Sequence, residues 1–183
     1  YAELQFVGDS EVGDHSAQEI REIDNLLRDR GKPVSCLSRH IFAGMTVANV
    51  PGDELHKKHM DALKRVIDMA HIVDSPLVRI MSPKKEQILW GSNGAEKWNV
   101  AQGAWDKMLP LIAPAIEVIK DAGLTLVVET GNGTMVKSNY TGRKLIDDLD
   151  AKGSLKVLWD PANNCWCHER AFPAGYEEVK DGY

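Results

Sequence analysis

Residues 124–129 read LTLVVE and residues 155–160 read LKVLWD. Each is a short, mostly apolar run that closes on a carboxylate, which is typical of a buried parallel strand. Similar short runs lie at residues 2–6, 33–37 and 77–81. Amphipathic helical patterns fill the gaps between these runs. The alternation predicts right-handed strand–helix–strand crossovers and therefore a parallel sheet in an α/β protein.

The helical patterns carry their own start signals. Ser16 and Glu19 form a capping box, in which each side chain accepts from the amide of the other residue. Further helices are predicted over residues 53–73, up to residue 123, over residues 139–150 and from residue 172 to residue 180. Pro110 and Pro114 lie inside the second of these and are expected to kink or restart it.

Two architectures agree with a parallel sheet of this kind. One is a barrel, whose functional sites lie at the carboxyl ends of the strands. The other is an open, doubly wound sheet. The sequence shows no internal repeat, linker or low-complexity segment, and its 183 residues suffice for one core. Residues 1–183 are therefore interpreted as a single domain.

Composition narrows the class of partner. The net charge of −5 disfavours a nucleic-acid partner, because phosphate binding needs a concentrated basic surface. No apolar run is long enough to span a membrane, and the first residues do not resemble a signal peptide. The three cysteines are an odd number and do not predict a disulfide framework, so Cys165 and Cys167 are interpreted as reduced thiols in a loop. We expect a cytoplasmic protein.

Glu129 and Asp160 are the leading candidates for a functional site. Strands that are adjacent in sequence usually lie side by side, so both carboxylates are expected at one rim of the sheet. Two close carboxylates repel, and a divalent cation relieves that repulsion. The alternative is that each carboxylate caps a helix or accepts from loop amides. The loops that follow, TGNG at residues 130–133 and PANN at 161–164, favour a ligand, because glycine permits close approach and asparagine bonds hydroxyl groups.

Other polar residues are weaker candidates. His40 follows the predicted third strand of a barrel and could bond a sugar, and Arg79 lies within the fourth and could hold a phosphate or carboxylate. A loop histidine and a structural ion pair are the alternatives. His56, His59 and His71 lie on one predicted helix without an accompanying acidic motif, and we interpret them as surface residues.

Four stretches resemble one known family. The segments LTLVVETG (124–131) and LKVLWDPAN (155–163) look like the fifth and sixth strands of the xylose-isomerase-like TIM barrels. The segments GKPVSCLSR (31–39) and YAELQ (1–5) look like the third and second strands. The resemblance implies a (β/α)8 barrel, here incomplete, with about strands 2 to 6. The first strand and the last two βα units are expected to lie outside this chain, in a longer protein.

The resemblance also implies a metal site. In that family Glu after the fifth strand, Asp after the sixth, His after the seventh and Glu after the eighth hold a divalent ion, and Glu129 and Asp160 match the first two. The ion could be Mn²⁺, Mg²⁺, Zn²⁺ or Co²⁺. The ketose epimerases usually carry His three residues after that Asp, where this chain has Asn163. His168, in the same loop, is either a substitute or a solvated surface residue. The substrate-binding candidates are Asn163, His40, Arg79 and His168.

The function that the resemblance implies is a metal-dependent sugar or sugar-phosphate isomerase or epimerase. Glu129 would remove a proton from a carbon next to a carbonyl, and the metal would stabilise the enediolate. Three alternatives stay open: an inosose-type dehydratase, an endonuclease IV-like nuclease, and a sugar-binding module without catalysis. The expected partner is a small carbohydrate, and the oligomeric state stays open between a monomer and a homo-oligomer.

Overall fold

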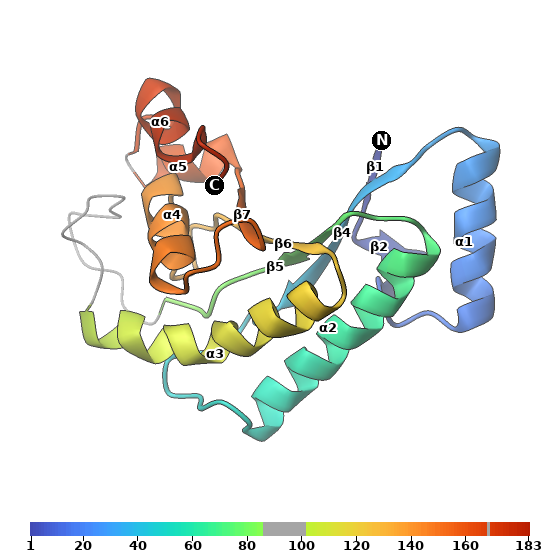
Figure 1. Ribbon diagram of the computed structural model, residues 1–183, viewed down its shortest axis with the longest axis horizontal. Coiled ribbons are helices and arrows are strands. Elements are labelled where there is room, and N and C mark those ends of the chain that lie inside the picture. The colour runs from blue at the N-terminus through green and yellow to red at the C-terminus, as the bar shows by residue number, and fades with distance from the viewer. Residues whose placement is uncertain (86–101, 168) are drawn as a thin grey trace.

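In a computed structural model, which describes residues 1–85, 102–167 and 169–183, the chain forms a five-stranded parallel sheet (Figure 1). The strands are β1 (Ala2–Leu4), β4 (Val34–Ile41), β5 (Leu77–Ile80), β6 (Thr125–Glu129) and β7 (Leu155–Leu158). They lie side by side in chain order, and every neighbouring pair is parallel. A doubly wound sheet reverses its order at a switch point, whereas a barrel does not. The strand order is therefore that of a section of a (β/α) barrel.

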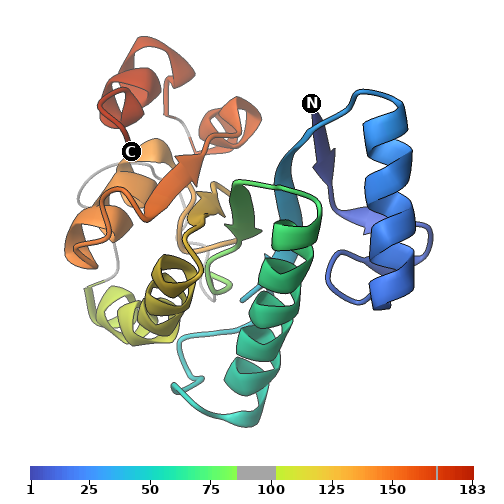
Figure 2. The same cartoon turned by 45° about the vertical axis from the view of Figure 1, so that its right-hand side comes forward.

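The described helices lie between and after the strands, and those that contact the sheet cover one of its faces. The helices are α1 (Ala17–Asp29), α2 (Glu54–Ile72), α3 (Gln102–Asp121), α4 (Asn139–Asp148), α5 (Pro161–Trp166), η2 (Ala171–Gly175) and α6 (Tyr176–Val179). α2 contacts β4 and β5, α3 contacts β6, and α4 contacts β7. Figure 1 shows α1 to α4 following one another around the outside of the sheet, and Figure 2 shows α1 and α2 side by side. A short hairpin, β2 (Phe6–Val7) and β3 (Ser10–Glu11), lies between β1 and α1 in the chain.

The helix-covered face holds the hydrophobic core. Leu37, Val78, Leu126 and Leu155 are register neighbours across β4, β5, β6 and β7, and each is fully buried. Full burial stabilises an aliphatic side chain of this size by about 1.5–3 kcal/mol. This apolar row fixes the register of the sheet, because a slip of one residue would turn the whole row to the other face.

The five predicted strands are confirmed, and so are most of the helices. β4 continues to Ile41, four residues beyond the predicted end. The capping box of α1 is present, with Glu19 N–H donating to Ser16 Oγ at 3.3 Å and Ser16 N–H to Glu19 Oε2 at 2.7 Å. α3 runs through Pro110 and Pro114 and is not restarted at either. The hairpin and the short helix α5 were not predicted, because neither segment is long enough to show a period.

The surface interpretation of the α2 histidines is wrong for His56. Its side chain is buried, and its Nε2–H donates to the Leu111 carbonyl at 2.9 Å while its Nδ1 accepts from the Gly52 amide. His59 is half-buried and accepts from the Phe42 amide through Nδ1, and burial lowers the pKa of its ring. Only His71 is exposed, as predicted. His56 therefore joins α2 to α3 through the Leu111 carbonyl, and His59 joins α2 to the loop that follows β4.

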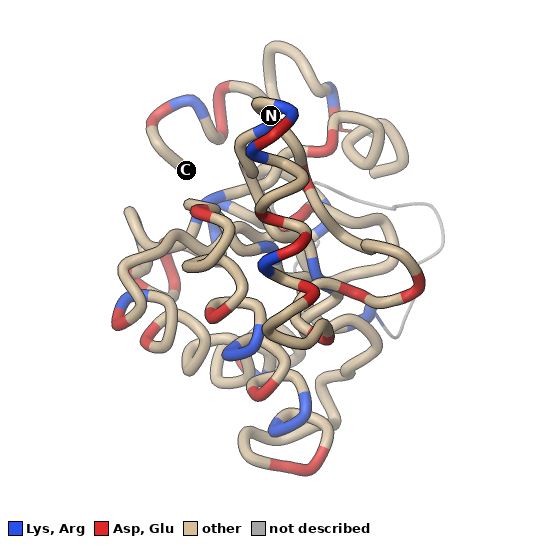
Figure 3. Tube along the Cα trace, turned by 90° about the vertical axis from the view of Figure 1, so that its right-hand side faces the viewer, with Lys and Arg blue, Asp and Glu red and all other residues tan. Residues whose placement is uncertain are grey.

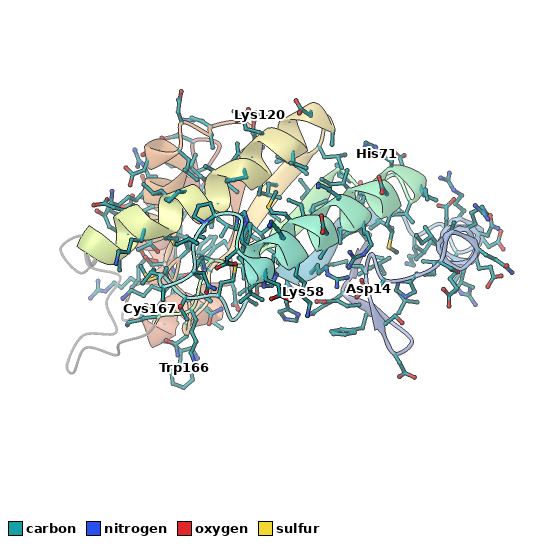
Figure 4. The ribbon with its side chains drawn as sticks, turned by 90° about the horizontal axis from the view of Figure 1, so that it is seen from below. Asp14, Lys58, His71, Lys120, Trp166 and Cys167 are labelled. Atoms are coloured by element: carbon teal, nitrogen blue, oxygen red, sulfur yellow. The ribbon has the colours of Figure 1, made fainter. Side chains whose placement is uncertain are left out.

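The three cysteines are free thiols in different surroundings. Cys165 is exposed, whereas Cys167 is buried and its Sγ–H donates to the Lys137 carbonyl at 3.3 Å. Between them Trp166 projects away from the protein (Figure 4). The two thiols therefore do not converge on a common ligand. Among the residues that the structure describes, no helix is long and apolar enough to cross a membrane.

A glycine in α4 sets how closely that helix packs on β7. A Cβ placed on Gly142 would lie 2.6 Å from Val157 Cγ2, which is too close without a shift. Gly142→Ala is therefore expected to lower the free energy of unfolding by about 1–3 kcal/mol, as overpacking does. Gly103 in α3 has open space around its Cβ position, so Gly103→Ala is expected to be neutral or stabilising by up to about 1 kcal/mol. Urea unfolding of both variants checks this, and equal effects would contradict the close packing.

Candidate active site

The face of the sheet that the helices leave uncovered is largely polar. Side chains alternate between the two faces of a strand, so the row next to the apolar row points to this inner face. Its register neighbours across β4 to β7 are Ser38, Arg79, Val127 and Lys156. The interior of a TIM barrel is usually filled by bulky aliphatic side chains. A row with a buried arginine and an exposed lysine instead indicates a site that receives polar groups.

Glu129 ends β6 one row above Arg79 and Val127 on this inner face. Its side chain is about one-fifth exposed, and its Oε2 accepts a hydrogen bond from Arg79 Nη1. Arg79 itself is buried, with 6% of its surface exposed. A buried guanidinium needs a charged partner, and Glu129 supplies it. The structural ion pair that was the alternative for Arg79 is thus present, and it involves the predicted catalytic carboxylate.

Asp160 lies at the corresponding end of β7. Its strand neighbour Leu158 is the register partner of Glu129, and an extended backbone at Asp160 places its side chain on the same face. Oδ1 accepts from the Ala162 amide at 2.9 Å, so Asp160 is the N-cap of α5. Oδ2 accepts from Asn163 Nδ2 at 2.7 Å. The capping role that the sequence left open is therefore real, and it orients the carboxylate.

Thr130 ties the two strand ends together. Its hydroxyl accepts from the Asp160 amide at 3.2 Å, and its carbonyl accepts from Asn163 Nδ2 at 2.7 Å. Its own amide donates to the Leu158 carbonyl at 3.3 Å. The residue directly after Glu129 thus holds the backbone of Asp160 and the side chain of Asn163. Glu129, Asp160 and Asn163 are brought to one rim of the sheet.

His40 lies in β4, not in a loop, and belongs to a separate cluster at the rim. Its ring Nδ1 lies 2.7 Å from Glu11 Oε1, and the same oxygen accepts from the His40 amide at 3.0 Å. Gln5 Nε2 lies 3.1 Å from the ring Nε2. A neutral ring with its proton on Nδ1 satisfies both contacts, since Glu11 then accepts and Gln5 donates. About half of the His40 side chain is exposed, so a ligand could reach it.

The oxygen atoms of Glu129 and Asp160 are of the type that binds a hard divalent cation. Carboxylate oxygens suit Mg²⁺, which is commonly bound through one or two carboxylates and keeps several waters. Within residues 1–85, 102–167 and 169–183, Glu129 Oε1 has no hydrogen bond, and each Asp160 oxygen accepts one bond and keeps a further lone pair. The same residues contain no cluster of three or more His, Cys, Asp or Glu that could hold a metal. The rest of a coordination shell would have to come from water, substrate or other ligands.

Sequence reasoning missed several members of the inner face. Ser38 donates to Glu3 Oε1 at 2.5 Å, and Lys156 shares the row of Arg79. The signal was present, because polar residues alternate with apolar ones in AELQ and LKVL, where a strand covered on both faces would be apolar throughout. His168, predicted as a substrate ligand, lies outside the described residues.

A parallel sheet in barrel order with carboxylates at the ends of two adjacent strands defines a (β/α)-barrel protein of the kind that binds its ligand at the carboxyl rim. A model of the xylose isomerase-like TIM barrel family matches residues 1–180, and the chain belongs to this family. The resemblance seen in the strand motifs is thereby confirmed. No curated relative matches the chain.

Solved structures share the fold. They include a xylose isomerase-like TIM barrel protein from Mycobacterium smegmatis in complex with magnesium, with a TM-score of 0.65 and 18% identity over 93% of this chain and 56% of that one. Another is 3-keto-D-glucoside 4-epimerase, YcjR, from E. coli, with a TM-score of 0.62 and 14% identity over 88% of this chain and 62% of that one. A third is the probable 3-DHS dehydratase AsbF from Bacillus anthracis, with a TM-score of 0.57 and 13% identity over 77% of this chain and 45% of that one. At these identities the likeness shows the fold alone, and the chain spans about half the length of each structure.

Proposed function

We propose that this chain carries the active-site rim of a metal-dependent isomerase or epimerase that acts on a small carbohydrate. The observation that carries the proposal is the polar inner face, on which Glu129 and Asp160 end adjacent strands and Thr130 fixes their spacing. Family membership supports it, because an epimerase and a magnesium complex are among the structures with this fold.

Each residue has a defined part in the proposed reaction. Glu129 and Asp160 would hold the divalent cation, which when bound supplies a Lewis acid for the carbonyl and neighbouring hydroxyl oxygens of the substrate. Glu129 removes the proton from the carbon next to the carbonyl. Because Arg79 donates to Oε2, the proton would go to Oε1, which has no hydrogen bond among the described residues. Asp160 is held by the α5 amide and by Asn163 and would serve as a ligand of the cation.

Hydroxyl groups of the substrate would meet Asn163 and His40. Nδ2 of Asn163 is used within the protein, which leaves its carbonyl oxygen to accept from a hydroxyl. His40 is held by Glu11 and Gln5 with part of its ring exposed, so it can hydrogen-bond or stack on a sugar. An Asn where epimerases of the family usually have His keeps hydrogen bonding and removes a titratable group.

The proposed partner is a small carbohydrate in the cytoplasm. Figure 3 shows Lys and Arg interspersed with Asp and Glu on the face that carries α1. A nucleic-acid-binding surface would instead concentrate positively charged residues. The net charge of −5 supports the same expectation. The endonuclease and the non-catalytic binding module remain outcomes of the test below.

The test is proton exchange. The protein is incubated in D2O with a panel of ketoses, aldoses and their phosphates, and deuterium at the carbon next to the carbonyl is measured by NMR and mass spectrometry. Incorporation with retained product mass supports isomerisation or epimerisation. Loss of one water from the product assigns a dehydratase, which shares the first proton transfer. Absence of exchange across the panel, with or without cleavage of an abasic oligonucleotide, would contradict the proposal.

A further inference from the structure

Arg79 has two hydrogen-bond donors for which the described chain offers no acceptor. Its Nη1 donates to Glu129, whereas Nε and Nη2 are buried and make no hydrogen bond. Only 6% of the residue is exposed. A buried donor left unsatisfied carries a desolvation cost, so buried polar groups without a partner are rare and usually point to a bound molecule or a functional role. The unpaired nitrogens of Arg79 therefore need an acceptor that the described part of the chain does not supply.

The two free nitrogens form one edge of the guanidinium group. Nε–H and one N–H of Nη2 run parallel in the plane of the guanidinium and share one of its edges, away from the Nη1 group that donates to Glu129. This fork is the geometry that accepts two oxygens of a carboxylate or phosphate together. A single hydroxyl oxygen would satisfy only one of the two donors. The chemistry that fits the whole edge is an oxyanion.

The location of this edge matches the proposed site. Arg79 lies in the row below Glu129 on the inner face, and its side chain reaches up to the Glu129 carboxylate at the rim. Lys156 occupies the same row two strands away, with Val127 between them. Lys156 is exposed and has no ion pair among the described residues. A second cation in this row favours a negatively charged group between the two.

We propose that the free edge of Arg79 binds an oxyanion of the substrate, a carboxylate or a phosphate, with Lys156 as a second, weaker contact. The inference rests on the proposed function, since it assumes that the substrate lies on the inner face. It narrows the substrate class to an acidic or phosphorylated sugar. Glu129 keeps the guanidinium in position through Nη1.

The test observes Arg79 directly. The Nε–H signal of each arginine is resolved in a ¹⁵N-correlated NMR spectrum of the full chain, and Arg79 is assigned by comparison with Arg79→Lys. Inorganic phosphate, glycolate and the neutral sugar erythrose are titrated separately. A saturable shift of the Arg79 signal is expected with phosphate, glycolate or both. Arg79→Lys keeps the charge next to Glu129 but lacks the fork. It should weaken oxyanion binding at least about tenfold, with the dissociation constant measured by calorimetry.

Two further variants sharpen the result. Lys156→Met should weaken binding by about threefold, because an exposed charge contributes little. Arg28→Lys, an exposed arginine paired with Asp24, should change nothing. A shift with phosphate alone assigns a phosphorylated substrate, and a shift with glycolate alone a sugar acid. No saturable shift with either anion, or an equal shift with erythrose, would overturn the inference. Metal binding and proton exchange that persist in that case would leave the proposed function standing, so the two failures are distinguishable.

Discussion

Replacing Glu129 by Gln is expected to slow substrate-dependent exchange of the carbon-bound proton by about 10²- to 10⁴-fold, the range that general-base catalysis contributes. Gln can still accept from Arg79 Nη1, so the buried guanidinium keeps a partner and the fold should persist. What Gln cannot do is take up a proton at neutral pH. The measurement is deuterium incorporation into the substrate in D2O, compared with the unmodified protein at equal concentration.

The matched control is Glu117→Gln. Glu117 lies on α3, is mostly exposed and pairs with Lys120 at 3.2 Å, so its replacement should leave exchange unchanged. A far-ultraviolet circular dichroism melt of both variants separates loss of the base from loss of the fold. Exchange at the unmodified rate in Glu129→Gln would show that another group is the base.

Much of the fold was predictable because most of its strands and helices have a clear period. The sequence runs that contain β6 and β7 are mostly apolar and close on Glu129 and Asp160, and the stripe and capping box of α1 are complete in the sequence. The resemblance of the strand motifs predicted a barrel, and the strand order confirms it. The strand and helix patterns alone could not choose between a barrel and a doubly wound sheet, because that choice depends on which strands pair. Strand order decides it, and strand order is a property of contacts between distant segments.

The candidate site was predictable only in part. That Glu129 and Asp160 follow adjacent strands could be inferred from the sequence, but the partner of each could not. Arg79 reaches Glu129 because β5 and β6 pair with Arg79 opposite Val127, a register that no local pattern shows. The cap that Asp160 provides depends on α5, which is too short to show a helical period. The ion pair of Glu129 with Arg79 and the N-cap that Asp160 forms both use carboxylate oxygens that a metal would also bind.

The second large effect therefore concerns metal binding. If the two carboxylates share a cation, Asp160→Asn removes a charged ligand while keeping an oxygen that can accept from the Ala162 amide and cap α5. The affinity for Mn²⁺ or Mg²⁺ should fall by at least about tenfold, since even outer-shell changes in metal sites cost 10- to 100-fold. Glu129→Gln should weaken binding similarly. Asp61→Asn, at an exposed position of α2, is the matched control and should bind as the unmodified protein does.

The central claim is that Glu129 and Asp160 together bind one divalent cation. The most direct measurement is a titration of the metal-free protein with Mn²⁺, with bound ion counted by electron paramagnetic resonance and affinity measured by calorimetry. One ion per chain is expected, with weakened binding in Glu129→Gln and in Asp160→Asn and none of this loss in Asp61→Asn. If both variants bind Mn²⁺ as tightly as the unmodified protein, or the unmodified protein binds none, Glu129 is satisfied by Arg79 alone and the claim is contradicted.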